Sequence, residues 1–463
     1  MTATAEGVFS PALRLVTIGL LVSVGIVAFD GLGVTTALPA IASDLRGMAT
    51  YGWAVSALML ASVAGTVIAG FLADRHNPRG PYLAGFGIFT AGLVVSGLAT
   101  GWAPFLLGRV IQGFGVGAIL SMAYVFIGRV YPPELQSRAL ALLSGAWTVP
   151  ALVGPLAASV LTEVASWRVL FLALIPIVGV TMIMTTRGLP ELGSSMDAPP
   201  TGMRQRPAYS VLLAASTAVL LFGLEQHGGV TSAGLTIAGL VGMLIGLRHV
   251  LPAGTLRLAP GMPSGIATRA VLSLAFFGIE VLLPLAMTQI RGASLFSAGL
   301  TLTAGALVWV AGSMVQSRRE QRVGSHTRRG DSIIGLVTLS LSIGIIAATL
   351  FVTVLPIGVA TLGWAIGGFG MGMAYNATTA ETFAQTEPAA IGAMSGTIQM
   401  AQTLATALIA GIGTAILAAT RSVDGSPDVG VAAILSLTGV LALATIPIAL
   451  RISAHRAHSA KAA

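Results

Sequence analysis

Residues 15–38 read LVTIGLLVSVGIVAFDGLGVTTAL, an apolar run that contains a single charged side chain, Asp30. About 20 apolar residues are enough for a helix to cross the roughly 30 Å of hydrocarbon in a bilayer. The run therefore predicts a membrane-spanning helix. A secretory signal peptide has a shorter apolar core, so we expect this segment to be a retained first span.

The same pattern recurs along the 463 residues, of which 55% are hydrophobic and 9% charged, with a mean hydropathy of +0.90. A water-soluble domain with so few charges could not cover its surface, so we predict an all-α membrane protein. The apolar runs predict fourteen spans in a six–two–six arrangement. They lie at about 15–38, 52–73, 82–101, 104–127, 139–161, 168–186, 208–224, 231–247, 270–290, 295–315, 332–352, 354–380, 391–418 and 431–450.

The basic residues predict the orientation of these spans. Of 24 Arg and Lys residues, nineteen fall in loops on one side of the membrane, four on the other, and Arg109 lies within a span. Loops rich in Arg and Lys face the cytoplasm, so both termini are expected there. The Arg, Ala and Gly bias is typical of a bacterial protein, and we expect the bacterial cytoplasmic (plasma) membrane. The basic residues then mark a membrane face, which excludes nucleic acid as a partner.

The charge pattern cannot distinguish two topologies of residues 208–247. Two helices that cross the membrane return the chain to the side on which it started, as a hairpin at the membrane surface also does. Residues 208–247 could therefore be two spans or an interfacial hairpin. Each of the two runs has about 17 residues without a charge, a length that favours crossing.

The two six-span blocks resemble each other. Gly113-Phe-Gly-Val-Gly117 in the fourth span matches Gly368-Phe-Gly-Met-Gly372 in the twelfth, and Asp30 in the first span corresponds to Glu280 in the ninth. Internal duplication of this kind is typical of transporters that rock two halves about a site near the membrane midplane. We predict an N-terminal six-helix bundle at 1–190, cytoplasmic linkers with a two-helix insert at 191–268, and a C-terminal six-helix bundle with a cytoplasmic tail at 269–463.

The residues that enzymes and metal sites use are scarce. There is no cysteine, and the six histidines all lie outside the predicted spans without ligand spacing. We therefore predict no enzyme, no catalytic residues, no metal and no cofactor. A receptor or scaffold would not explain paired halves with buried acids.

The loop after the second span reads GFLADRHNPR at residues 70–79. It resembles the G-x-x-x-D-R-x-G-R-R loop, motif A of the major facilitator superfamily. Asn77 stands where the family has Gly, and Pro78 stands where it has an Arg. The resemblance implies a cytoplasmic gate loop formed by Gly70, Asp74, Arg75 and Arg79.

Four other segments are similar to motifs of the drug:proton antiporters in that superfamily. They are FDGLGVTTALPAIASDL at 29–45, GRVIQG at 108–113, GPLAAS at 154–159 and WRVLF at 167–171. In the third of these, Gly154 and Pro155 match the antiporter helix kink. With the extra central pair, the resemblance implies the 14-span branch: a major facilitator fold of two six-helix bundles with two helices between them. We expect the protein to act as a monomer.

The resemblance and the intramembrane charges together suggest a function. A charge at the centre of a bilayer costs roughly 3 kcal/mol, so such residues are functional candidates. Asp30 and Arg109 lie at similar estimated depths, and we expect Asp30 to carry the proton while Arg109 sets its affinity. A static ion pair is the alternative. Glu280 is expected to be a second proton site or a contact for a cationic substrate.

We thus predict proton-coupled export of amphipathic or drug-like small molecules by alternating access, with small molecules, protons and the lipid bilayer as partners. The alternative is an exporter of one specific lipid, glycolipid or metabolite, or a proton-coupled uptake transporter. Polar and aromatic side chains in the spans are candidates for the substrate cavity. They are Gln112, Tyr124, Trp147, Gln289, Trp364, Asn376, Gln399 and Gln402.

Overall fold

The computed structural model describes residues 7–75, 77–189, 206–226, 229–386, 391–424 and 427–452. Within these ranges all regular secondary structure is helical. The chain divides into two compact units, and each is considered by itself. Unit 1 consists of Met1–Gly47 and Ala57–Ala214, and unit 2 of Met48–Ser56 and Ala215–Ala463. Residues 191–205 of the predicted central region and 453–463 of the predicted tail lie outside the described ranges.

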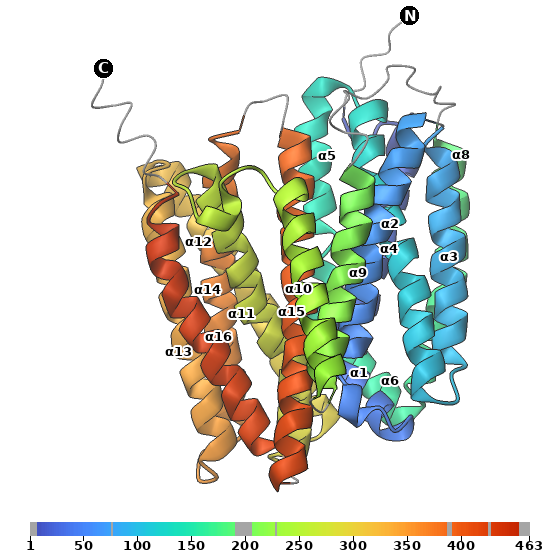
Figure 1. Ribbon diagram of the computed structural model, residues 1–463. Coiled ribbons are helices and arrows are strands. Elements are labelled where there is room, and N and C mark those ends of the chain that lie inside the picture. Colours follow the sequence, from blue (N-terminus) through green and yellow to red (C-terminus); the bar gives the residue numbers. More distant parts are fainter. Residues whose placement is uncertain are drawn as a thin grey trace, which may run out of the picture. The chain divides into compact units, whose positions relative to one another are not determined.

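Unit 1 is built from the N-terminal helices (Figure 1). In it α3 packs along α4, and α1 packs against α6 and α8. The indole of Trp167 and the guanidinium of Arg168 both donate to Asp44 Oδ2 at 3.0 Å, which ties the start of α7 to the end of α1. The helices are α1 (Arg14–Asp44), α2 (Trp53–Arg75, from Ala57 on), α3 (Arg79–Gly97), α4 (Trp102–Val130), α5 (Pro133–Gly145), α6 (Thr148–Val164), α7 (Arg168–Leu172), α8 (Leu174–Gly188) and the first part of α9 (Arg206–Glu225).

Two of the predicted spans of unit 1 are each divided into two helices. The predicted span at 139–161 is divided between α5 and α6, and that at 168–186 between α7 and α8. A proline ring clashes with the carbonyl of the fourth residue before it. Pro150 and Pro176 place that clash at Ala146 and Leu172, where the helices are interrupted. The helix continues through Pro155.

Unit 2 contains the C-terminal helices. In it α14 packs against both α12 and α13, and α11 packs against α15 and α16 (Figure 1). The helices are the rest of α9, α10 (Val230–Val250), the short η3 (Thr255–Arg257), α11 (Met262–Gln289), α12 (Leu295–Val323), α13 (Thr327–Phe351), α14 (Gly358–Phe383), α15 (Ile391–Asp424) and α16 (Asp428–Ala449), with η1 (Met48–Thr50) and the first turn of α2.

The duplicated glycine segments have equivalent surroundings inside their own units. In α4, a Cβ at Gly113 would overlap the backbone of α2, and a Cβ at Gly115 the backbone of α3. In α14, a Cβ at Gly368 would overlap α12, and a Cβ at Gly370 would overlap α13. Each segment thus lets one central helix approach two neighbours on opposite sides, which explains why the two blocks share a G-x-G-x-G pattern.

The apolar helices confirm the prediction of an all-helical membrane protein. Twelve helical segments of the described residues are long and apolar enough to cross a bilayer, and both α9 and α10 are among them. α6, with 17 residues, and α14 are not counted among the twelve. Fourteen spans therefore remain a prediction.

Candidate functional site

The core of the candidate site is a buried three-residue cluster in unit 1. Asp30 of α1 and Arg109 of α4 are each 2% exposed, and Gln112 of α4 is fully buried. Arg109 Nη1 donates to Asp30 Oδ2 at 3.0 Å and to Gln112 Oε1 at 3.1 Å. Gln112 Nε2 donates to Asp30 Oδ1 at 3.1 Å, so both carboxylate oxygens are occupied.

The sequence of α3 and α4 positions Gln112. Ser96 Oγ of α3 donates to Gln112 Oε1 at 3.1 Å, so the amide group is held from two sides. A Cβ at Gly92 would overlap Gln112, and a Cβ at Gly108 would overlap Ser96. The two glycines therefore permit the close approach of α3 and α4 on which the Ser96–Gln112 bond depends.

The cluster has the hydrogen-bonding pattern of an ionised carboxylate. An ionised Asp only accepts hydrogen bonds, whereas a protonated one must also donate. The two oxygens of Asp30 face N–H donors of Arg109 and Gln112, so the arrangement corresponds to the deprotonated acid. A buried ion pair of this kind brings little net stability, because the desolvation of both charges offsets their attraction.

The predicted helix-kink residues lie beside this cluster. Gly154 and Pro155 are buried in α6. A Cβ at Gly154 would come within ordinary contact distance of Phe29 and Leu32 in α1, which flank Asp30. A Cβ at position 154 would therefore fit against the part of α1 that carries the acid without changing how α6 packs on it.

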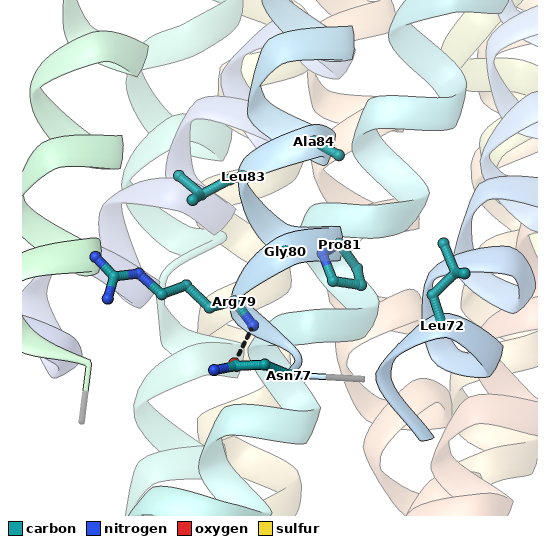
Figure 2. Close-up of a pocket in the computed structure, with 7 residues that line it drawn as sticks. All are labelled: Leu72, Asn77, Arg79, Gly80, Pro81, Leu83 and Ala84. Atoms are coloured by element: carbon teal, nitrogen blue, oxygen red, sulfur yellow. Dashed lines mark hydrogen bonds between the residues drawn. The ribbon is translucent and has the colours of Figure 1, made fainter. Parts of the chain in front are cut away.

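The predicted gate loop is placed in part. Gly70 lies in α2, and Asn77 Oδ1 accepts from the backbone N–H of Arg79 at 2.9 Å, a bond made at the start of α3. Asn77 and Arg79 are among the residues that line an open pocket of about 670 Å³. Figure 2 shows these lining residues. Asp74 and Arg75 close α2, but their side chains lie outside the described part of the structure.

Unit 2 places the second predicted acid beside a group of aromatic rings. Glu280 is half-buried in α11, and the next residue, Val281, accepts through its carbonyl from the Tyr51 hydroxyl at 3.2 Å. Residues three and four apart on a helix share a face, so Phe276 and Phe277 lie on the side of Glu280. No hydrogen bond or ion pair joins the Glu280 carboxylate to another described residue.

The aromatic group extends across three helices. Phe276 stacks on Trp364 of α14 with ring centroids 4.5 Å apart, and its edge meets Trp309 of α12 at 5.1 Å. Trp309 contacts Tyr375 of α14 at 5.3 Å. Trp364 is buried, whereas Trp309 and Tyr375 are half-buried.

Arg269 is a buried residue that lies just before the predicted ninth span at 270–290. The helix α11 begins at Met262, so Arg269 lies two turns inside it and is 3% exposed. Its guanidinium donates to the Tyr375 carbonyl at 3.1 Å, to Thr379 Oγ1 at 2.7 Å and to Gln402 Oε1 at 3.0 Å. It also stacks over the ring of Tyr375, and the Tyr375 hydroxyl donates to Gln402 Oε1 at 3.2 Å. Arg269 thereby joins α11, α14 and α15.

The predicted cavity residues fall into three groups by exposure. Gln112 and Trp364 are buried. Tyr124, Trp147 and Gln289 are exposed, and the half-buried ones are Asn376, Gln399 and Gln402. Within the described ranges, His, Asp and Glu residues form no group of three or more that could hold a metal ion.

Comparison with known proteins identifies a family. The profile of the Major Facilitator Superfamily matches residues 20–410. The chain is 28% identical over 324 residues to the Uncharacterized transporter YebQ of Escherichia coli K12, covering 68% of this chain and 69% of that protein. It is 26% identical over 328 residues to Multidrug resistance protein 3 of Bacillus subtilis, covering 68% of this chain and 62% of that protein, less than two thirds of its length.

A third relative and the solved structures agree with this match. The chain is 24% identical over 378 residues to the Multidrug transporter protein MdtP of Bacillus subtilis, covering 77% of this chain and 69% of that one. The crystal structure of a D-xylose-proton symporter superposes with a TM-score of 0.70 over 95% of this chain and 97% of its own, at 14% identity. At that identity the likeness concerns the fold alone.

Proposed function

The chain belongs to the major facilitator superfamily, and from that premise we propose that it exports amphipathic, drug-like small molecules across the bacterial cytoplasmic membrane in exchange for protons. Two of its relatives carry multidrug names, which supports this class of substrate. The observation that carries the proposal is the buried cluster of Asp30, Arg109 and Gln112, because it pairs a carboxylate that can take up a proton with a permanent cation, on two helices long and apolar enough to cross a bilayer.

The burial and the hydrogen bonds of Asp30 support proton coupling. Asp30 is 2% exposed, so a proton can reach its carboxylate only when the helices around it move. Protonation would remove the negative charge that pairs with Arg109 and would weaken the hydrogen bonds from Arg109 and Gln112, which links protonation to a change in the contact between α1 and α4. One proton moved across 100 mV supplies about 2.3 kcal/mol for this cycle.

The half-buried side chains of unit 2 suggest where the substrate binds. Trp309 and Tyr375 offer ring faces, and Gln402 offers an amide group held by Arg269. Glu280 lies on the helical face of Phe276 and Phe277. Aromatic faces and a carboxylate attract cationic groups, so we propose that this surface binds flat apolar substrates with a positive charge, unless Glu280 serves as a second proton site.

We also propose fourteen spans, the arrangement of the 14-span drug:proton antiporters. Both α9 and α10 have the length and apolar character of a span. Adding α14 and the divided helix α5–α6 to the twelve candidate segments would complete two blocks of six around them. Residues 70–79 would then serve as the cytoplasmic gate loop.

Transport by reconstituted protein tests the proposal. Wild-type protein in proteoliposomes should drive a fluorescent lipophilic cation against its gradient when a pH gradient is imposed, with protons moving the opposite way. Asp30→Asn, which cannot ionise, should lose gradient-driven transport while retaining exchange of labelled for unlabelled cation. Asp30→Glu should keep part of the coupling.

Two results would contradict the proposal. Undiminished pH-driven transport by Asp30→Asn would remove Asp30 from the coupling site. Movement of cation and protons in the same direction would indicate uptake instead of export. A matched control is Asp44→Asn, which removes an exposed acid that pairs with Arg168 at the end of the same helix.

A further inference from the structure

The outer face of α12 carries a stripe of exposed apolar side chains. Phe296, Leu300, Leu307, Met314 and Val315 are 38–56% exposed. Their spacing of about four and seven residues keeps them on one side of the helix. The opposite side of α12 is buried, for example at Leu302 and Gln316. The stripe is therefore the side of α12 that the other helices of unit 2 leave uncovered.

The length of the stripe matches the hydrocarbon thickness. From Phe296 to Val315 the helix rises about 28 Å at 1.5 Å per residue, close to the roughly 30 Å of a bilayer core. The helix then continues for two turns, to Val323, beyond the predicted span at 295–315. These two turns therefore extend into the zone of the lipid headgroups.

Two arginines continue the stripe into that zone. At 100° per residue, Arg318 lies directly in line with Leu300, and Arg322 lies about 40° from it. Both side chains are exposed. Neither forms an ion pair or hydrogen bond with another described residue. Their Cα atoms thus lie about 5 and 10 Å along the helix from that of Val315, on the uncovered side of α12.

The other charged residues of these turns are already paired within unit 2. Arg319 Nε donates to Asp331 Oδ1 at 2.9 Å. Glu320 accepts from Gln316 and pairs with Arg328, which also pairs with Glu381 of α14 at 3.3 Å. These contacts fix the rotation of the extended helix end, so they hold Arg318 and Arg322 on the opposite, outer side.

We propose that Arg318 and Arg322 bind the phosphodiester group of an anionic phospholipid whose acyl chains lie along the apolar stripe of α12. The planar guanidinium fork suits phosphate oxygens in a bidentate arrangement. Arginines near a membrane surface each contribute enough attraction to anionic lipid to change occupancy roughly fivefold. The basic excess of this loop assigns the lipid to the cytoplasmic leaflet.

Native mass spectrometry of the full-length protein tests this proposal. Delipidated protein is mixed with equal amounts of dioleoylphosphatidylglycerol and dioleoylphosphatidylcholine, and the bound lipids are counted. Wild type should retain phosphatidylglycerol preferentially. Arg318→Gln and Arg322→Gln should each reduce that preference about fivefold, and the double variant should abolish it. The double Lys variant should be intermediate, since Lys keeps the charge and loses the fork.

Arg329→Gln is the matched control, because Arg329 is an exposed arginine on the next helix, α13. It should retain the wild-type preference. The proposal is overturned if the double Gln variant still prefers phosphatidylglycerol, or if Arg329→Gln loses as much. Displacement of the lipid by millimolar inorganic phosphate would also overturn it, because the site would then bind a free anion. Size-exclusion profiles show whether each variant is folded. If the double Gln variant does not fold, the lipid preferences of the two single variants provide the test.

Discussion

Two arginines are buried among the described residues, and their partners differ in chemical kind. Arg109 in unit 1 donates to a carboxylate, Asp30, and to the amide oxygen of Gln112. Arg269 in unit 2 donates to three neutral oxygens, from Tyr375, Thr379 and Gln402. A proton taken up by the carboxylate would change the bonds of the first arginine. The three oxygens that accept from the second are a carbonyl, a hydroxyl and an amide oxygen, so we assign Arg269 a positioning role.

Replacing Arg269 tests that role. Arg269→Lys should raise the KM for the exported cation several-fold and change the maximal rate less, because a single ammonium group cannot hold Tyr375 and Gln402 together. Arg269→Gln should have a larger effect in the same direction. Transport rates measured over a range of substrate concentrations separate the two parameters.

The control for Arg269 is Arg257→Gln, which removes an exposed arginine of unit 2 outside the long helices. It should leave both parameters unchanged. If the Arg269 variants have a lower Tm but the folded protein keeps a normal KM, Arg269 stabilises the packing of the helices and has no effect on substrate binding.

At the scale of single helices, small residues determine the geometry of the site. A Cβ at Gly108 would lie within about 3 Å of the side chain and backbone of Ser96. Gln112 is one turn further along α4 and accepts from that same serine. Any widening of the contact between α3 and α4 would therefore also loosen the amide that donates to Asp30.

Gly108→Ala should destabilise the protein by about 1–3 kcal/mol, the usual cost of overpacking a close helix contact. Thermal unfolding of the purified protein should show a lower Tm, and coupled transport should fall with it. Gly128→Ala is the control in the same helix, because a Cβ there meets nothing within 4 Å. It should be neutral or slightly stabilising, since Ala favours helix over Gly by about 1 kcal/mol. Equal effects of the two substitutions would contradict this account.

Helix identity was predictable from the sequence, whereas helix ends and interruptions were less so. Apolar length identified the membrane helices because hydrocarbon thickness sets it. Helices continue past the apolar run into polar turns, which an apolar pattern does not reveal. The helix α11 already begins at Met262, and α12 ends only at Val323. Arg269 was missed for this reason. Pro150 and Pro176 were visible signals for the interruptions of the fifth and sixth spans.

The cluster around Asp30 was partly predictable. Similar depth in the membrane brought Asp30 and Arg109 together as a candidate pair, and Gln112 lies on the face of Arg109 because it is three residues away. The role of Ser96 was not predictable, because a serine in an apolar helix usually bonds to its own backbone. The contact depends on how two helices pack, which no local pattern reports.

For the whole molecule, the membrane topology of α9 and α10 is the main prediction. The chain has no cysteine, so a single introduced cysteine is the only thiol. Gln226→Cys, exposed after α9, should react with a membrane-impermeant maleimide on intact cells. Ala253→Cys, exposed after α10, should react only after the cells are permeabilised. Labelling of both positions only after permeabilisation would instead indicate a hairpin that lies at the cytoplasmic surface.

The burial of Asp30 also bears on the energy supply of the cell. A membrane that holds many copies of a transporter would lose its proton gradient if each idle copy exchanged protons freely with both sides. In the arrangement described above, Asp30 is 2% exposed, so a proton reaches it only after the surrounding helices move. We therefore expect an idle protein to be tight to protons, so that a cell can keep it in the membrane continuously without draining the gradient that drives its ATP synthesis.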